Sequence, residues 1–299
     1  MKIALLIVYN HRFDRNIPIL EHMYEGRFSH IFHIVPFYDG HLSNVIPVYD
    51  SSYQFQGYIA QAYQHIKSMG FTHYFVVADD MVIHPRINEK NLYEKLEIDS
   101  DCCYMQKLIK FQENEKLWRL DEALKYRPNQ KGCEIKNIIP SKELAEKRFI
   151  EMGIPTQTIP FKLIRRLFKV FTFSRNRWLT NFECFYILTR NRGRSLQYPL
   201  VGGYSDIFIV TADVMPSFVQ FCGAFAATRL FVEIAIPTAM VLSGAKIKFD
   251  KDVALRAMPL WSENDKSFLQ KYNNSLAALI ADYPKDVLFM HPIKLSKWK

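Results

Sequence analysis

The sequence is poor in cysteine. Only five of its 299 residues are cysteine, and none of them form a C-x-x-C pair. An odd number of cysteines without that spacing fits a reducing compartment better than a disulfide framework. We therefore expect a cytoplasmic protein without structural disulfides.

The sequence also lacks a long hydrophobic run. Its most apolar long window, residues 207–242, is broken by four residues that a membrane span tolerates poorly: Asp213, Arg229, Glu233 and Pro237. The opening stretch "MKIALLIVYNHR" has seven apolar residues in a row and no small-residue cleavage site, which argues against a signal peptide. We expect the chain to be soluble, or peripheral on the inner face of the cell membrane.

Acidic residues are fewer than basic ones. The chain has 30 Asp and Glu against 39 Lys and Arg, a net charge of +9. This balance favours polyanionic partners: phosphates, anionic lipid or nucleic acid. Hydrophobic residues make up 49% of the chain, enough for a sizeable core, so disorder is not expected.

Apolar runs and amphipathic stretches alternate near the start of the chain. Three strands are predicted, at "KIALLIVY", "HIFHIVPF" and "THYFVVADD". Two helices are predicted between them, at residues 15–25 and 53–69. The second helix, closed by Gly70, places five residues on one apolar face: Tyr58, Ile59, Ala62, Ile66 and Met69. The alternation predicts an α/β sheet with parallel strands, in which ligands bind beyond the carboxyl ends of the strands.

Later segments are less regular. Residues 86–195 are expected to form a mostly helical insertion, and nine Lys and Arg are interleaved with apolar residues in 161–194. The last part, residues 196–299, is predicted to contain a strand, a Gly202-Gly203 turn, a second strand, two helices across 212–242, a helix over 262–281 and a strand at "DVLFM". We expect one domain over 1–299, of which residues 1–85 are the first part.

Two adjacent acids, Asp79 and Asp80, directly follow the apolar residues 75–78. Neighbouring carboxylates in an apolar setting raise each other's pKa unless a cation neutralises them. Mg²⁺ or Mn²⁺, which bind carboxylate and phosphate oxygens, would do so. The alternative is that one acid caps the next turn and the other is solvated. The preceding apolar run and the nearby Pro85 favour a metal site.

The same stretch resembles a known family. A strand that ends in an acidic pair after an N-terminal βαβ unit is similar to the GT-A type glycosyltransferases. More specifically, four stretches resemble the galactofuranosyltransferase domains of bacterial O-antigen and capsule synthesis: "HYFVVADDMVIHP", "GGYSDIFIV", "LFVEIAIPTAM" and "HPIKLS". The resemblance touches both ends of the chain and leaves about residues 85–195 unmatched.

The resemblance implies a GT-A-like fold: a Rossmann-like, mostly parallel sheet flanked by helices. It also implies a metal-dependent, inverting transfer of a sugar, such as galactofuranose, from a UDP-sugar to a lipid-linked surface glycan. Asp79 and Asp80 would bind Mn²⁺ or Mg²⁺, and His291 would complete the site, although a lone histidine could equally bond backbone. Lys294 and Lys297 would contact the diphosphate, although exposed tail lysines are usually only solvated.

The nucleotide would bind to residues 1–85. The resemblance implies base and ribose contacts after the first strand, after the second strand and near the start of the second helix, at Tyr9, Asn10, Arg12, Asp39, Gln54, Gln56 and Gly57. Asp79 would also meet the nucleotide through the metal. Each of these residues could instead serve as a turn or cap.

Two carboxylates could accept the proton of the acceptor hydroxyl. Glu233 lies in an apolar predicted helix, where Arg229, four residues earlier on the same face, could neutralise it. That pair could also be purely structural. Asp206 follows two glycines on a predicted turn, which it could simply cap. The family pattern favours Glu233 as the base and Asp206 as an acceptor contact.

The basic segment 161–194 allows three interpretations. It could lie on an anionic membrane surface, where polyprenyl-diphosphate acceptors are found, or it could be an ordinary helix with a solvated cationic face. Nucleic-acid binding is not expected, because no recognisable module is present. Two rival functions remain: a sugar nucleotidyltransferase, although the loop "YNHRFDR" lacks a glycine-rich turn, and a non-catalytic protein that binds membranes or polyanions.

Overall fold

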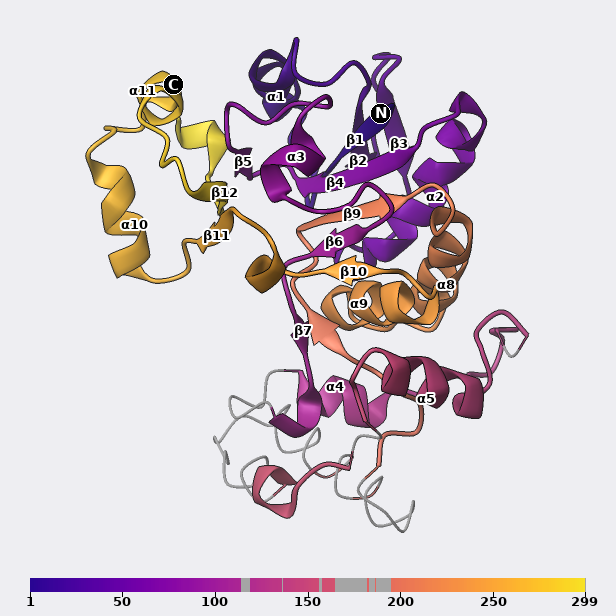
Figure 1. Ribbon diagram of the computed structural model, residues 1–299. Helices are drawn as coiled ribbons and strands as arrows, with labels where there is room; N and C mark the ends of the chain where they lie inside the picture. The colour runs from indigo at the N-terminus through magenta and orange to yellow at the C-terminus, as the bar shows by residue number, and fades with distance from the viewer. Residues whose placement is uncertain are drawn as a thin grey trace. The chain divides into compact units, whose positions relative to one another are not determined.

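The computed structural model describes residues 1–113, 119–135, 137–155, 158–164, 182, 186 and 195–298 (Figure 1). The chain forms two compact units. The sheet unit contains Met1–Lys107, Asp206–Met215 and Lys246–Lys299, and the helical unit contains Leu108–Ser205 and Pro216–Ala245. Most of the basic segment 161–194 lies outside the described residues.

A seven-stranded sheet forms the centre of the sheet unit. Its strands, in spatial order, are β10 (Ile247–Lys248), β6 (Cys103–Met105), β9 (Ile207–Thr211), β4 (His73–Ala78), β1 (Ile3–Val8), β2 (Ile31–Pro36) and β3 (Val45–Val48). Only β9 runs antiparallel to its neighbours, β4 and β6. All residues of β1 and β4 are buried, as expected for central strands covered on both faces. The predicted α/β sheet with mostly parallel strands is therefore confirmed.

Three α-helices lie in the first segment of the sheet unit, Met1–Lys107: α1 (Ile17–Tyr24), α2 (Gln56–Ile66) and α3 (Leu92–Leu96). The predicted apolar face of α2 is buried at Tyr58, Ile59, Ala62 and Ile66. A short 3₁₀ turn follows, and Gly70 ends it with φ of 69°, a left-handed conformation that glycine adopts without strain. Met69, predicted on the buried face, is exposed, because it lies in the 3₁₀ turn beyond the helix.

A smaller sheet lies in the C-terminal part of the same unit. Its strands are β11 (Arg256–Pro259), β12 (Val287–His291) and β5 (Val82–Ile83), in that order. The predicted strand "DVLFM" is thus confirmed as β12. The single helix predicted over 262–281 is wrong: the chain forms α10 (Glu263–Gln270) and α11 (Leu276–Ala281). Asn273 and Asn274 interrupt the helix because both have left-handed φ values, 47° and 57°.

The helical unit contains α4 (Leu120–Lys125), α5 (Lys142–Glu151), α8 (Met215–Ala227) and α9 (Val232–Leu242). The first residue of α8, Met215, ends the second segment of the sheet unit. The two helices predicted across 212–242 are therefore confirmed. The predicted Gly202-Gly203 turn is wrong: these buried glycines form strand β8, which pairs antiparallel with β7 (Leu108–Ile109). The hydroxyl of Thr238 on α9 joins the backbone of Val201, just before β8, by bonds of 3.1 and 3.2 Å. Among the described residues, no helix has the length and apolarity to cross a membrane.

Candidate functional site

The strand order creates a topological switch in the sheet unit. The chain proceeds from β1 through β2 to β3 on one side, then returns to place β4 on the other side of β1 (Figure 1). Ligands of open α/β sheets bind at such a switch, beyond the carboxyl ends of the strands. Tyr9 and Asn10 follow β1 there, and Asp79 and Asp80 follow β4.

The turn that carries the two acids is fixed by backbone hydrogen bonds on both sides. The amide of Ala78 donates to the carbonyl of Asp206 at 2.8 Å, and the amide of Asp79 donates to Val8 at 3.0 Å. The side chain of Asn16, just before α1, donates to Oδ2 of Asp79 at 2.9 Å. Burial and the charge of Asp80 raise the pKa of Asp79 to about 7, against the effect of the Asn16 bond.

His291 reaches this turn through the small sheet. Strand β12 pairs antiparallel with β5, matching Met290 with Val82, and β5 begins two residues after Asp80. The pairing brings Nε2 of His291 to 2.8 Å from Oδ1 of Asp80. The amide of Ile293 also donates to the backbone carbonyl of Asp80, at 2.6 Å. Residues more than two hundred positions apart are therefore held together by strand pairing.

Asp206 joins the same edge because β9 is reversed. It immediately precedes β9, and the first residue of an antiparallel strand lies beside the carboxyl ends of its parallel neighbours. Oδ2 of Asp206 lies 3.9 Å from Nδ1 of His291. Burial lowers the pKa of His291, but the close contact with Asp80 and the charges of Asp206 and Asp79 outweigh it and raise the pKa above its usual value. The edge therefore holds an excess of negative charge.

The side chains at this edge are of the types that bind a divalent ion, but their ligand atoms are not close enough together to hold one. Carboxylate oxygens with one imidazole nitrogen are ligands that Mn²⁺ accepts. Oδ1 of Asp80 is buried, and its contact is with Nε2 of His291 at 2.8 Å, so an ion at this oxygen would have to share it with the imidazole or displace the ring. However, Asp79, Asp80 and His291 do not form a group whose ligand atoms all lie within 4.8 Å of one another. Binding one ion with all three would need a side-chain rotation.

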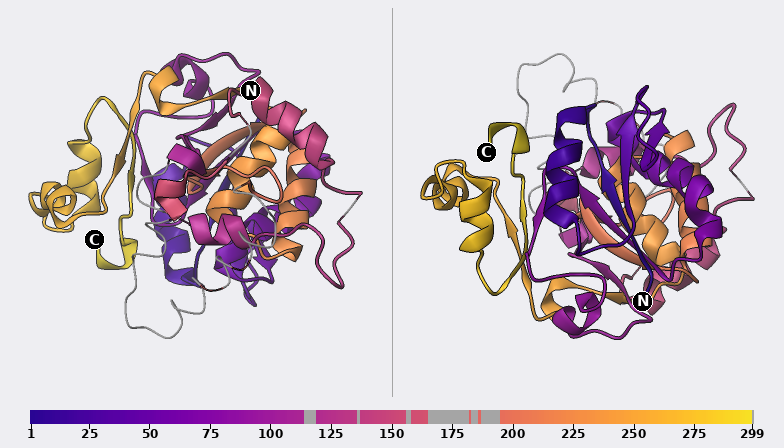
Figure 2. Two further views of the ribbon diagram at one scale, coloured as in Figure 1. Left: turned by 90° about the horizontal axis from the view of Figure 1, so that it is seen from below. Right: turned by 90° about the horizontal axis from the view of Figure 1, so that it is seen from above.

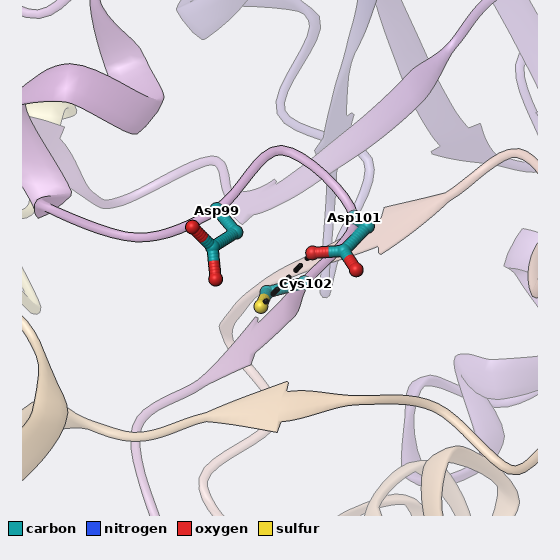
Figure 3. Close-up of side chains that lie close together, drawn as sticks. All are labelled: Asp99, Asp101 and Cys102. Atoms are coloured by element: carbon teal, nitrogen blue, oxygen red, sulfur yellow. Dashed lines mark hydrogen bonds between the residues drawn. The ribbon is translucent and has the colours of Figure 1, made fainter.

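A different group does meet that distance. In the part of the chain that the structure describes, one oxygen each of Asp99 and Asp101 and the sulfur of Cys102 lie within 4.8 Å of one another (Figure 3). The Cys102 thiol lies 3.6 Å from Asp101, and Nζ of Lys246 lies 3.3 Å from Asp99 and 3.1 Å from Asp101. Since both acids are exposed and paired with a lysine, we assign no metal to this group. It was not predicted from the sequence.

The first loop contains a second cluster of predicted residues. Arg12 pairs with Asp39 and lies 3.1 Å from Asp14. It also donates to the carbonyl of Phe37 at 3.3 Å. The loops after β1 and β2, both predicted to contact the nucleotide, are thus joined through one guanidinium. Asn10 lies half-buried beside them.

Tyr9 and Gln56, both predicted to contact the nucleotide, are buried. The hydroxyl of Tyr9 and Nδ1 of His33 form a hydrogen bond of 2.8 Å, and Nε2 of His33 lies 2.8 Å from Glu21. Gln56 begins α2 and, with Gly57, lies on its inner side. Tyr9 is buried because it directly continues the buried strand β1, and Gln56 and Gly57 are buried because they lie on the inner face of α2. Gln54, one 3₁₀ turn earlier, is half-buried.

Two exposed aromatic residues at this edge were missed. Phe37 and Tyr49 follow β2 and β3, are 60% and 62% exposed, and have ring centroids 5.8 Å apart. Phe37 also has a φ of 54°, a strained conformation for a residue with a bulky side chain. An exposed ring held at a cost in backbone strain suggests a binding role. In the sequence, Phe37 is the last residue of the predicted strand "HIFHIVPF", and no strand was predicted before Tyr49, so neither ring stood out as part of a loop.

Glu233 belongs to the helical unit. It is half-buried in the first turn of α9. Arg229 does not share a helical face with it: α8 ends at Ala227, and Arg229 lies in the connecting loop with φ of 57°. The prediction that both residues lie on one helix is therefore wrong.

Lys294 and Lys297 are exposed in the C-terminal segment of the sheet unit, where both line a pocket beside α10.

Comparison with known proteins found no family model that matches the chain and no match among curated proteins.

Proposed function

We propose that the protein is a metal-dependent glycosyltransferase of the GT-A type, which transfers a sugar from a UDP-sugar to a lipid-linked surface glycan with inversion. The observation that carries this proposal is the meeting of Asp80, His291 and Asp206 at the carboxyl edge beside the β1–β4 switch. The donor sugar that the sequence resemblance implies is galactofuranose. The lipid-linked acceptor would bring the enzyme to the inner face of the membrane.

The metal would be Mn²⁺ or Mg²⁺, held by Asp80 and His291 with Asp79 beside them. When bound, it would supply positive charge that stabilises the leaving diphosphate. Arg12 and Asp39, which are paired with each other, would hold the ribose and base edge. The exposed ring of Phe37 would support the base by stacking.

The acceptor hydroxyl must lose its proton as its oxygen bonds to the anomeric carbon and the bond to UDP breaks. Two carboxylates are candidates for this base. Asp206 is favoured by its place at the edge, where its side chain is 15% exposed and 3.9 Å from His291. Glu233 is favoured by the family pattern. A carboxylate at either position would accept the proton and leave UDP to carry the released negative charge.

Titration calorimetry of UDP, with Mn²⁺ and with EDTA, tests the proposal. We expect tight binding with Mn²⁺ only, and its loss in Asp80→Ala. The matched control is Asp99→Ala, which removes an acid of the other cluster and should leave UDP binding unchanged. Equal binding of UDP with and without metal would contradict the proposal, and so would loss of binding in the Asp99 variant alone. A non-catalytic polyanion-binding protein would give the first of these results.

A further inference from the structure

A pocket of about 540 Å³ lies beside the C-terminal segment of the sheet unit. Its walls come from α10 and the turn after it, and from residues 292–298. The C-terminal end and the helices α10 and α11 lie near one another in both views of Figure 2. The volume is in the range of pockets that bind small molecules, roughly 300–1,000 Å³.

The charged groups of this pocket all have one sign. Lys266, Lys294 and Lys297 line it, and no Asp or Glu does. Lys266 has a partner outside the lining, Glu263, at 2.8 Å. The ammonium groups of Lys294 and Lys297 have no carboxylate within 4.0 Å among the described residues. Three ammonium groups around one cavity repel each other, so an anion that enters lowers the energy of the site.

The rest of the lining suits an organic group. Leu269, Pro292 and the buried Ile293 give an apolar wall, and the half-buried ring of Trp298 offers a flat face. The adjacent amides of Asn273 and Asn274 can donate and accept hydrogen bonds. A bare inorganic anion would use the lysines and leave the apolar and aromatic surfaces without a partner.

We infer that this pocket is a second binding site, which takes a small organic phosphate with an apolar or aromatic part. Phosphate would be held by Lys266, Lys294 and Lys297, and the organic part would lie on Trp298 and Leu269. The inference does not depend on the proposed metal site, because none of the residues that carry it belongs to the acidic edge. It does assign Lys294 and Lys297 to this pocket, whereas the sequence resemblance implied that both contact the nucleotide diphosphate. The pocket is still connected to that edge: Pro292 follows His291 directly.

The probes are phenyl phosphate and inorganic phosphate, titrated calorimetrically into the full chain in EDTA, so that no metal-dependent nucleotide site contributes. Phenyl phosphate should bind at least several-fold more tightly than inorganic phosphate. The double variant Lys266→Met, Lys297→Met should weaken phenyl phosphate binding by more than about tenfold, since each lost ammonium removes a charge-assisted hydrogen bond. The control is Lys285→Met, an exposed lysine of the same unit outside the pocket, which should bind as wild type does.

Two further measurements test the aromatic contact and the source of the phosphate. Phenyl phosphate should change the tryptophan fluorescence of the wild type. Trp298→Phe should still bind phenyl phosphate but should not show this change. Vesicles containing phosphatidylglycerol should compete with phenyl phosphate only if the natural phosphate is a lipid headgroup rather than a soluble ester. Unchanged binding in the double lysine variant, or an equal loss in Lys285→Met, would overturn the inference. Asp80→Ala should retain the binding, so failure of the glycosyltransferase proposal would be seen separately.

Discussion

Replacing His291 by glutamine should destabilise the sheet unit by about 2 kcal/mol. The imidazole lies 2.8 Å from Asp80, and the two side chains are 5% and 29% exposed. Removing one member of a fully buried ion pair costs about 3–5 kcal/mol, because the remaining charge is left without a partner. We expect a smaller cost, about 2 kcal/mol, because Asp80 keeps some contact with water, which screens its charge.

Urea unfolding in EDTA measures this change as a shift in the midpoint at constant slope. The control is Lys271→Gln, which breaks another short pair, Lys271 with Asp282 at 2.7 Å, whose side chains are 52% and 67% exposed. Its midpoint should hardly move, since surface pairs contribute little. Equal destabilisation by the two substitutions would refute the idea that burial gives the His291 contact its strength.

The same variant tests the metal. A ligand that binds only the folded state at a hundred times its Kd stabilises by about 2.7 kcal/mol. Saturating Mn²⁺ should therefore raise the urea midpoint of the wild type and leave that of His291→Gln almost unchanged. An equal rise in both proteins would show that His291 takes no part in binding the ion.

Three other predictions concern separate parts of the chain. Burial lowers the pKa of His73 below 6.5, so the folded protein binds this proton less readily than the unfolded chain. The contribution of neutral His73 to the free energy of unfolding is therefore complete above pH 6.5 and is lost as the pH drops toward the lowered pKa. The urea midpoints at pH 7.5 and 5.5 should differ less in His73→Gln than in the wild type. Asp206→Asn and Glu233→Gln together identify the base: the variant that lacks it should no longer transfer sugar from the UDP-sugar but should bind UDP with the affinity of the wild type. Phe37→Ala should raise the Kd for UDP about tenfold without lowering the melting temperature, whereas Leu42→Ala, exposed on the same loop, should change neither.

The elements that sequence reasoning predicted are the long ones. Strands β1, β2 and β4 are six residues long and mostly apolar, and α2 has an apolar face, so each carries a local signal in the sequence. Strands β5, β8 and β10 have two residues each, too few for any period, and they exist because a neighbouring strand completes their hydrogen bonds. This pairing depends on the tertiary structure, so a local sequence pattern does not predict it.

The site divides in the same way. Asp79 and Asp80 could be identified because their signal, a charged pair after an apolar run, is local. The contact of His291 with Asp80 depends on the register of β12 against β5, and the approach of Asp206 depends on the reversal of β9. The burial of Tyr9 could not be predicted, because the sequence at the end of a strand does not show which way the next side chain points.

The electrostatics of the acidic edge support the proposed metal on grounds other than the sequence resemblance. Burial and the charge of Asp80 raise the pKa of Asp79, and nearby carboxylates raise that of His291. Both shifts therefore include a contribution from excess negative charge, since such charge disfavours a carboxylate and favours an imidazolium. A diphosphate that approached this edge alone would add two or more negative charges to that excess. If UDP binds beside Asp80, a cation must bind before it or with it, whereas an organic phosphate in the lysine-lined pocket beside α10 needs none.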